Sequence, residues 1–544
     1  MPKQVYRADV LVIGGGLAGI ATALELVDRG VSVVLLERGP EERFGGLAKL
    51  SFGGLFFVDS PEQRRSGIKD SYELALHDWL RFGELSDADV WPRRWAESYI
   101  ERSVPDVRDW LYRRGVRFLP AVNWTERGYF VPGNSVPRFH ITWGTGRGIV
   151  DPLVAALRSG TTAAELVLRF EHRVDELVTK DGAVIGCAGH TAGGEDFEAY
   201  AGATVLAAGG IAGNLGKIRE HWAKSLGPPP EELLNGSHLE ADGAMLDEAV
   251  RNGARVTHLE NMWNYAAGVR HWRPRFENDG LSLVPGKSAL WLDPGGRRFC
   301  DPPLVGSFDT LHLVERICRE PKKYSWQVLN MRIARRELAI SGGEFNPELR
   351  EHKLGAFLLR MLFGDRKLPQ ELIANCPDVV TATSVAELAA KMNKLIGNHD
   401  VDAERLAAEI ADYDANIDRG AALQNDDQLR RIAQVRKYKG DRLRTCKNQK
   451  ILEPGAMPLI AMRLRIVTRK SLGGVVVDTE GRVLDEHDRP LSGLYAAGEI
   501  CGFGGGGIHG RRALEGTFLG GCIFTGRRVA ESIARGRTSA GRVA

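Results

Sequence analysis

Apolar positions near the start of the chain change their spacing twice within about forty residues. A compact apolar run at 8–13 is typical of a buried strand, whereas residues 17–28 repeat apolar positions at the spacing of a helix. A second run, rich in β-branched residues, follows at 31–37. The order strand, helix, strand predicts a βαβ unit and therefore a parallel sheet. Apolar runs at 203–208 and 493–497 predict two further strands of the same α/β character.

The segment between about 285 and 450 follows another pattern. Helical spacing of apolar residues dominates at 384–395 and 402–417. Ser384 and Glu387 have the spacing of a capping box at the start of the first of these helices. The α/β pattern returns after this segment. We therefore predict three consecutive parts: an α/β domain over 1–285, a mostly helical insertion over 286–450 and the rest of the α/β domain over 451–544.

Three glycines lie between the first predicted strand and the first predicted helix. In the pattern Gly14-x-Gly16-x-x-Gly19, the first glycine permits a tight turn, the second lets backbone approach a diphosphate, and the third lets helix and strand pack closely. The diphosphate would bind the free N–H groups at the helix N-terminus. Glu37 ends the second strand, where a carboxylate can accept hydrogen bonds from ribose hydroxyls. This context predicts a dinucleotide site.

Composition and charge exclude several classes of protein. The formal net charge is +3 over 544 residues, which is too small to indicate nucleic acid or an anionic membrane as the main partner. The sequence contains no apolar stretch of about 18 residues, so we expect no membrane span. Seven scattered cysteines without a CxxC pair indicate no metal site and suit a reducing compartment, so we expect a cytoplasmic protein. One basic run, 430–450, holds nine Lys or Arg against one Asp and has two interpretations, a solvated face or a surface that steers an anionic substrate or electron donor.

Segments along nearly the whole chain resemble, in order, those of the flavoprotein superfamily of fumarate reductase, succinate dehydrogenase flavoprotein and 3-ketosteroid dehydrogenase. Within this superfamily the chain is similar to bacterial FAD-binding dehydrogenases of the ketosteroid branch. The matching segments are GGLAKLSFGG at 45–54, TVLAAGGIAGN at 204–214, ADGAMLDEAVRNGA at 241–254, WLDPGGRRFCD at 291–301, the helical segment 384–420, and 471–478 with 493–526.

Only one dinucleotide fingerprint is present, which favours FAD, because a flavoenzyme that also used NAD(P)H would need a second fingerprint. The resemblance likewise implies FAD as the cofactor. It also implies a Rossmann-type FAD-binding domain that is interrupted by a mostly helical α+β capping domain, which binds the substrate. The residues expected to bind FAD come from the fingerprint, the early glycine loop and the C-terminal motifs. They are Gly14, Gly16, Leu17, Ala18, Gly19, Glu37, Arg38, Gly45, Gly46, Leu47, Ala48, Ser51, Gly53, Gly54, Val174, Ala208, Gly209, Asn214, Asp242, Gly498, Glu499, Leu514, Gly516 and Thr517.

Departures from the family pattern restrict the cofactor attachment and the substrates that we expect for this chain. Leu47 occupies the position at which membrane-bound relatives attach FAD through a histidine, so we expect noncovalent FAD. Fumarate and succinate enzymes hold dicarboxylates with a histidine and an arginine, and here Lys470 and Ala513 align with these positions. Arg512, one residue away from Ala513, could replace the missing guanidinium. Asp301 aligns with the family's proton-relay glutamate, without the arginine that usually follows.

The remaining chemistry is hydride transfer between a flavin and a carbon–carbon bond next to a carbonyl, in which an acid/base group moves the paired proton on the neighbouring carbon. Tyr265, Tyr324, Lys470, His509 and Arg512 are the candidate catalytic residues. Core packing remains an alternative for both tyrosines, a structural hydrogen bond for His509, and a solvated charge for Lys470.

These features favour an FAD-dependent enzyme that desaturates, or in reverse reduces, a carbon–carbon bond next to the carbonyl of an apolar, ketosteroid-like substrate. The alternatives are a reductase of unsaturated organic acids of the fumarate type, and a non-catalytic flavin or electron-transfer protein. We expect the partners to be a small carbonyl substrate and an external electron acceptor or donor, and the sequence leaves an oligomer open.

Overall fold

The structure is a computed structural model that describes residues 4–160, 162 and 165–540. The chain forms two compact units. Unit 1 contains the chain up to Trp222, then Ser237–Trp263, and then the chain from Arg469 onward. Unit 2 contains Ala223–Gly236 and Asn264–Thr468. The boundaries between these units differ from the expected domain boundaries at 285 and 450. The reason is that strands before 285 and after 450 belong to the sheet of unit 2.

A six-stranded sheet forms the centre of unit 1. All its neighbouring strands pair in parallel except the edge strand β22, which is antiparallel to β23. The strands β2, β3 and β11 are buried at every position, as expected for a parallel sheet covered on both faces. All four strands expected in the α/β parts are present. The order is β22 (Arg482–Leu484), β23 (Pro490–Ala496), β11 (Ala203–Leu206), β2 (Val10–Ile13), β3 (Val33–Leu36) and β7 (Leu166–Arg169).

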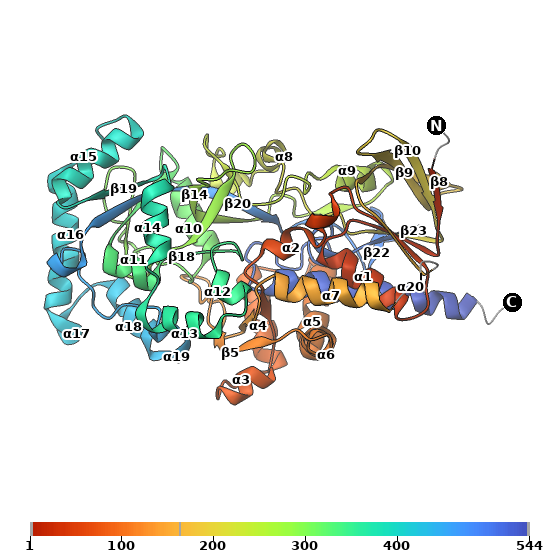
Figure 1. The fold of residues 1–544 in the computed structure, drawn as a ribbon, viewed down its shortest axis with the longest axis horizontal. Helices are drawn as coiled ribbons and strands as arrows, with labels where there is room; N and C mark the ends of the chain where they lie inside the picture. The colour runs from red at the N-terminus through yellow and green to blue at the C-terminus, as the bar shows by residue number, and fades with distance from the viewer. Residues whose placement is uncertain (1–3, 161, 163–164, 541–544) are drawn as a thin grey trace. The chain divides into compact units, whose positions relative to one another are not determined.

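Helices and smaller sheets complete unit 1. The predicted first helix, α1, packs against α7 and α20 (Figure 1). The helices of this unit are α1 (Leu17–Val27), α2 (Gly46–Leu50), α3 (Pro61–Arg65), α4 (Tyr72–Gly83), α5 (Val90–Arg102), α6 (Asp109–Arg113), α7 (Arg147–Ser159), α8 (Leu215–Glu220), α9 (Ala244–Arg251) and α20 (Thr517–Ala540). The smaller sheets are β1 (Gln4–Arg7) with β10 (Asp196–Tyr200), β9 (Ala183–Thr191) and β8 (His172–Lys180); β4 (Gly54–Phe56) with β6 (Phe139–Thr142) and β5 (Phe118–Asn123); and β13 (Val256–Thr257) with β21 (Gly474–Val475).

Unit 2 is organised around an eight-stranded sheet, while most of the regular structure within 286–450 is helical, as expected for that segment. Its strand β17 is buried at all seven positions, so it shows none of the alternation by which a half-exposed strand is found in a sequence. The strands are β16 (Leu290–Leu292), β17 (Tyr324–Asn330), β20 (Leu459–Ser471), β14 (Met262–Arg270), β15 (Gly280–Val284) and β18 (Ala339–Ile340), with β12 (Leu234–Asn235) and β19 (Val379–Ala382) paired to β20.

The two helices expected in this segment are confirmed as α15 and α16. Ser384 is the N-cap of α15 and accepts a hydrogen bond from the backbone N–H of Glu387 at 3.2 Å, whereas the Glu387 carboxylate accepts from Thr383. The helices of unit 2 are α10 (Thr310–Cys318), α11 (Met331–Glu337), α12 (Pro347–Arg350), α13 (Leu354–Phe363), α14 (Lys367–Asn375), α15 (Val385–Ile396), α16 (Ala403–Asp418), α17 (Gly420–Leu423), α18 (Asp427–Lys437) and α19 (Lys439–Arg442). Within the described ranges, no helix combines the length and hydrophobicity that crossing a bilayer requires.

A buried ion cluster in unit 1 yields a stability prediction. Arg138 is fully buried and donates to both carboxylate oxygens of Asp70 at 2.8 Å and to Asp78 at 2.6 Å. Arg138→Met would leave the buried Asp70 without its cation and Asp78 with only Arg81, 3.5 Å away, so we expect the free energy of unfolding to fall by about 3–5 kcal/mol in urea titrations. Arg64→Met, which breaks an exposed pair with Asp59, is the control and should cost about 1 kcal/mol or less. Equal losses in the two variants would contradict this assignment.

Candidate functional site

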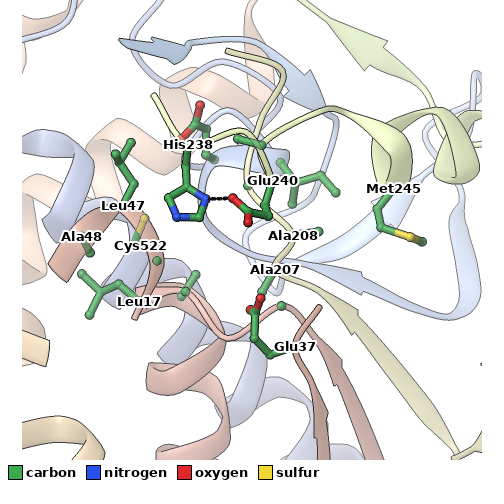
Figure 2. A pocket seen from close by; sticks show the side chains of 18 of the residues that line it. Leu17, Glu37, Leu47, Ala48, Ala207, Ala208, His238, Glu240, Met245 and Cys522 are labelled. Carbon is green, nitrogen blue, oxygen red and sulfur yellow. Dashed lines mark ion pairs between the residues drawn. The ribbon is translucent and has the colours of Figure 1, made fainter. Parts of the chain in front are cut away.

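The main cavity of unit 1 lies at the carboxyl ends of the parallel strands, which is where open α/β sheets bind ligands. Ile13 and Leu36, the last residues of β2 and β3, line it, as does Ala207, which follows β11. Other wall segments come from the turn before α1, from α2, from the loop before α9, from the end of β20, from the segment after β23, and from the first turns of α20. Figure 2 shows part of this wall.

The three fingerprint glycines have three different surroundings. A Cβ at Gly14, where φ is 109°, would lie 2.4 Å from the Ala207 carbonyl oxygen, and a Cβ at Gly19 would lie 2.0 Å from the Gly14 carbonyl oxygen. Gly16 lines the cavity, and a Cβ added there would meet no atom of the described chain within 4 Å. Gly14 and Gly19 are therefore required for packing, whereas Gly16 leaves space for a ligand.

The start of α1 and Glu37 form a site suited to a nucleotide. Gly16 is the N-cap of α1 and provides no side chain, so the first-turn N–H groups are available to an anion. The Glu37 carboxylate accepts hydrogen bonds from the backbone N–H groups of Gly15 and Gly39, both at 2.6 Å. These bonds fix the carboxylate in the cavity wall, and each oxygen still has a lone pair for a hydroxyl group.

Charged side chains near the loop before α9 form a second part of the wall. Arg38 forms an ion pair with Asp242 at 2.8 Å. Glu240 pairs with both His238 and Arg43, and the side chains of His238 and Glu240 point toward each other in Figure 2. Burial opposes ionisation of Glu240, but the hydrogen bond from His238 and the charges of His238 and Arg43 outweigh it and lower its pKa to about 2.

Lys470, near the end of β20, and Glu499, which follows β23, are two further ionisable groups of the cavity wall. Burial and the charge of Arg469 lower the pKa of Lys470 to about 8. Its ammonium lies 4.4 Å from the ring centre of Phe518, on α20. Burial raises the pKa of Glu499, whose carboxylate accepts hydrogen bonds from the backbone N–H and the hydroxyl of Ser471 at 3.0 and 3.2 Å. Lys470 is therefore a group that can exchange a proton near neutral pH.

His509 and Arg512 are not in the cavity wall. His509 is buried and stacks on Trp79, and both its ring nitrogens lack a hydrogen-bond partner among the described residues. Burial and the charge of Lys470 lower the pKa of His509 to about 3, so its ring is neutral at pH 7. The guanidinium of Arg512 forms an ion pair with Glu84, and the neighbouring Arg511 pairs with the same carboxylate at 2.9 Å. A carboxylate of the chain therefore already compensates the charge of Arg512.

Both candidate tyrosines belong to unit 2. Tyr265 is partly exposed on β14. Tyr324 is buried on β17, packs edge-to-face on Trp326 at 6.1 Å between ring centres, and lies under the guanidinium of Arg463 at 4.7 Å. These contacts favour the core-packing interpretation of Tyr324.

Most of the residues expected to bind FAD lie in the cavity wall. These are Gly14, Gly16, Leu17, Ala18, Glu37, Arg38, Gly45, Gly46, Leu47, Ala48, Ser51, Val174, Ala208, Gly209, Asp242 and Glu499, and Lys470 accompanies them. The remaining residues lie outside the wall. Four glycines, Gly53, Gly54, Gly498 and Gly516, have neighbouring atoms too close for a Cβ, as Gly19 does. Asn214 caps α8, and Thr517 donates to the carbonyl oxygen of Leu514 at 2.6 Å.

Sequence reasoning missed several wall residues, among them Arg43, His238, Glu240, Phe503 and Cys522. Arg43, His238 and Glu240 belong to none of the matching segments, whereas Phe503 and Cys522 lie within 493–526. Arg43 lies about 200 residues before Glu240, so their ion pair forms only in the folded chain. Gly210 was also missed as a close-packing position: a Cβ there would lie 2.4 Å from Glu499.

The residues of the cavity fit FAD. The space at Gly16, the start of α1 and Glu37 suit its diphosphate and ribose. Burial raises the pKa of Cys522, the one cysteine of the wall, so its thiol remains protonated and weakly nucleophilic. Leu47, at the position of the family's attachment histidine, lies in the wall and cannot form a bond to flavin.

We therefore expect trichloroacetic acid to release all the flavin of the purified protein into the supernatant. The measurement is the flavin absorbance of supernatant and pellet, together with in-gel fluorescence after denaturing electrophoresis. A fluorescent protein band would contradict noncovalent binding and would direct attention to His172 and His238, the two histidines of the cavity wall.

Comparison with known proteins gives consistent matches along the chain. The family model described as FAD binding domain matches residues 9–519. A KsdD-like steroid dehydrogenase of Mycobacterium tuberculosis is 43% identical, over 97% of this chain and 96% of that protein. A cytochrome-type fumarate reductase of Shewanella frigidimarina is 25% identical, over 97% of this chain and 77% of that protein.

Solved structures show the same fold. The 3-ketosteroid Δ1-dehydrogenase from Sterolibacterium denitrificans, in complex with 1,4-androstadiene-3,17-dione, matches with a TM-score of 0.71 and 18% identity, over 97% of this chain and all of that one. The mixed arrangement of helices and sheets described above is therefore a flavoprotein fold.

Proposed function

This chain belongs to the FAD-binding-domain family of flavin-dependent oxidoreductases, and on that basis we propose that it introduces a carbon–carbon double bond next to the carbonyl of a steroid ketone, or catalyses the reverse reaction. The observation that carries this proposal is the cavity wall of unit 1, in which Lys470, with a pKa of about 8, borders the same cavity as the residues that suit FAD. The steroid-dehydrogenase relative, which matches over nearly its full length, supports the substrate class.

The bound flavin would supply hydride acceptance or donation at its ring. The protein's own residues have other tasks. The first turn of α1 holds the diphosphate, and Glu37 accepts hydrogen bonds from the ribose. Lys470 takes the proton from the carbon next to the carbonyl during desaturation and returns a proton to it during reduction. Phe503 and Phe518 give this part of the wall an apolar surface.

We assign the capping and substrate-binding role to unit 2, and specifically to the segment 286–450. The fold of a Rossmann-type domain interrupted by such a cap agrees with the strand order of unit 1 and with the division of the chain into two units. Tyr265, partly exposed on β14, remains the tyrosine proposed to contact substrate, and the buried Tyr324 is assigned a packing role.

A reductase of unsaturated acids needs a cationic clamp for a carboxylate. Ala513 is fully buried at the position where the clamping arginine is expected, and Arg512 forms an ion pair with Glu84. Both observations favour an uncharged ketone as the substrate.

Anaerobic titration of the flavin absorption band tests the proposed function. We expect saturated 3-ketosteroids to bleach the oxidised protein, and the matching enones to reoxidise dithionite-reduced protein. Reoxidation by fumarate-like acids alone would replace the proposal with the organic-acid reductase, with Arg511 and Arg512 as the next residues to mutate. A flavin that responds to neither panel would support a non-catalytic flavin protein.

A further inference from the structure

Helix α13 differs from every other helix of unit 2 of comparable length. Its ten residues, LGAFLLRMLF, are apolar apart from Gly355 and Arg360, and a helix that is apolar on all sides is normally buried. None of the ten is buried in this structure. The side chains most exposed on it are Leu354 (56%), Leu358 (50%), Leu359 (58%), Leu362 (56%) and Phe363 (72%).

Polar contacts hold this helix in place instead of an apolar core. The Arg360 guanidinium pairs with Glu348 and with Asp365, both at 3.1 Å. Arg336, on α11, donates to the carbonyl oxygen of Leu362 at 2.6 Å. The exposed leucines and Phe363 are therefore displayed on a fixed helix, and such a contiguous apolar surface usually marks a site of interaction.

Basic residues surround this apolar surface. The segment 350–367 contains five Lys or Arg against two acidic residues, and Lys353, Arg366 and Lys367 at the two ends of the helix are exposed. The basic run 430–450 reaches the same place, since the charges of Arg360 and Asp365 both act on Arg444. Figure 1 draws α13, α18 and α19 at the same edge of unit 2. Lys437, Lys439 and Arg442 of this run are exposed.

We propose that α13 is an interfacial helix through which the protein docks reversibly on the surface of an anionic lipid bilayer. The exposed leucines and Phe363 would enter the boundary between headgroups and acyl chains, while the flanking lysines and arginines contact lipid phosphates. This combination of apolar face and basic border is the one that such a surface recognises. A second copy of the chain is a poorer occupant, because a self-complementary contact would bring two basic borders together.

Docking on a bilayer would affect the proposed reaction, although the docking proposal does not depend on that reaction. Apolar ketones partition into bilayers, so a docked enzyme would meet its substrate at a raised local concentration. The charge of the 430–450 segment would then steer the protein toward an anionic membrane surface, which is a different partner from the anionic substrate or electron donor considered from the sequence.

Co-sedimentation of the FAD-loaded protein with vesicles tests the proposal. We expect binding to vesicles of 70% phosphatidylcholine and 30% phosphatidylglycerol, at least about tenfold weaker binding to pure phosphatidylcholine, and loss of most binding in 0.5 M NaCl. Leu359→Gln/Phe363→Gln removes two apolar anchors without changing the charge, and it should reduce binding to the anionic vesicles at least about tenfold. Both side chains are exposed, so flavin content and Tm should not change.

The control is Val5→Gln/Val250→Gln, which replaces two exposed apolar residues of unit 1 (51% and 44%). It should bind vesicles like the unmodified protein. Failure of the unmodified protein to bind anionic vesicles, equal loss in both double variants, or equal binding to neutral and anionic vesicles would each overturn the proposal. So would a dimer, seen in light scattering, that dissociates in Leu359→Gln/Phe363→Gln while vesicles are ignored. None of these readouts requires turnover, so they are separate from the test of the reaction.

Discussion

Gly16→Val is expected to yield a folded protein that no longer retains FAD. Gly16 has an ordinary φ of −74°, and a Cβ there meets no described atom within 4 Å, so the substitution leaves the packing of the chain intact. The isopropyl group would instead occupy the space in which backbone approaches the diphosphate. We expect FAD affinity to fall by on the order of 100-fold, or about 2.7 kcal/mol, in fluorescence titrations of the apoprotein.

Substitutions of two other glycines should give different results from Gly16→Val. Gly14→Val should fail to fold or lose most of its stability, because φ is 109° and the new Cβ would lie 2.4 Å from the Ala207 carbonyl oxygen. Gly536→Val, at an exposed position of α20 with open space around the Cβ, is the matched control and should retain FAD. If Gly16→Val bound FAD normally, the cavity described here would not be the cofactor site.

Lys470→Met is expected to lower kcat by about 10²–10⁴-fold, the usual contribution of a general acid or base, while the flavin stays bound. Lys470→Arg should be similarly impaired, since a guanidinium does not give up its proton at accessible pH. Lys49→Met is a suitable control, because Lys49 is partly exposed, does not line the cavity and donates to the carbonyl oxygen of Glu42 at 2.9 Å. A variant at Lys470 with unchanged kcat would remove this residue from the mechanism.

The acid/base role of Lys470 also predicts how the rate of each reaction direction changes with pH. Because burial and Arg469 lower the pKa of Lys470 to about 8, the neutral amine becomes the major form as pH rises through about 8. Desaturation requires the amine as a base and should therefore accelerate across that range, whereas reduction requires the ammonium as an acid and should slow down. The two profiles should cross in the wild-type protein, and this dependence should be absent in Lys470→Met. Parallel profiles for the two directions would contradict the acid/base role.

The fingerprint could be predicted from the sequence because its parts are close along the chain. Gly14, Gly16 and Gly19 belong to a single turn, and Glu37 ends the next strand, so spacing alone indicates the shared site. The sheet of unit 2 could not be predicted in the same way. Its strands β12, β14, β15 and β20 lie outside the expected insertion, and the pairing of β12 with β20 joins Leu234 to Val467, 233 positions apart.

The sequence by itself determined the α/β character of unit 1, the nucleotide-binding turn and the departures at Leu47, Lys470 and Ala513, since each depends on local spacing or on the identity of one residue. Only the tertiary structure decided that Arg512 pairs with Glu84, that His509 is buried against Trp79 and that Arg43 pairs with Glu240, because side chains distant in the sequence set the charge and burial of each group. It also decided that the apolar α13 is exposed: an apolar sequence favours burial, but the surrounding fold determines whether a partner surface is available.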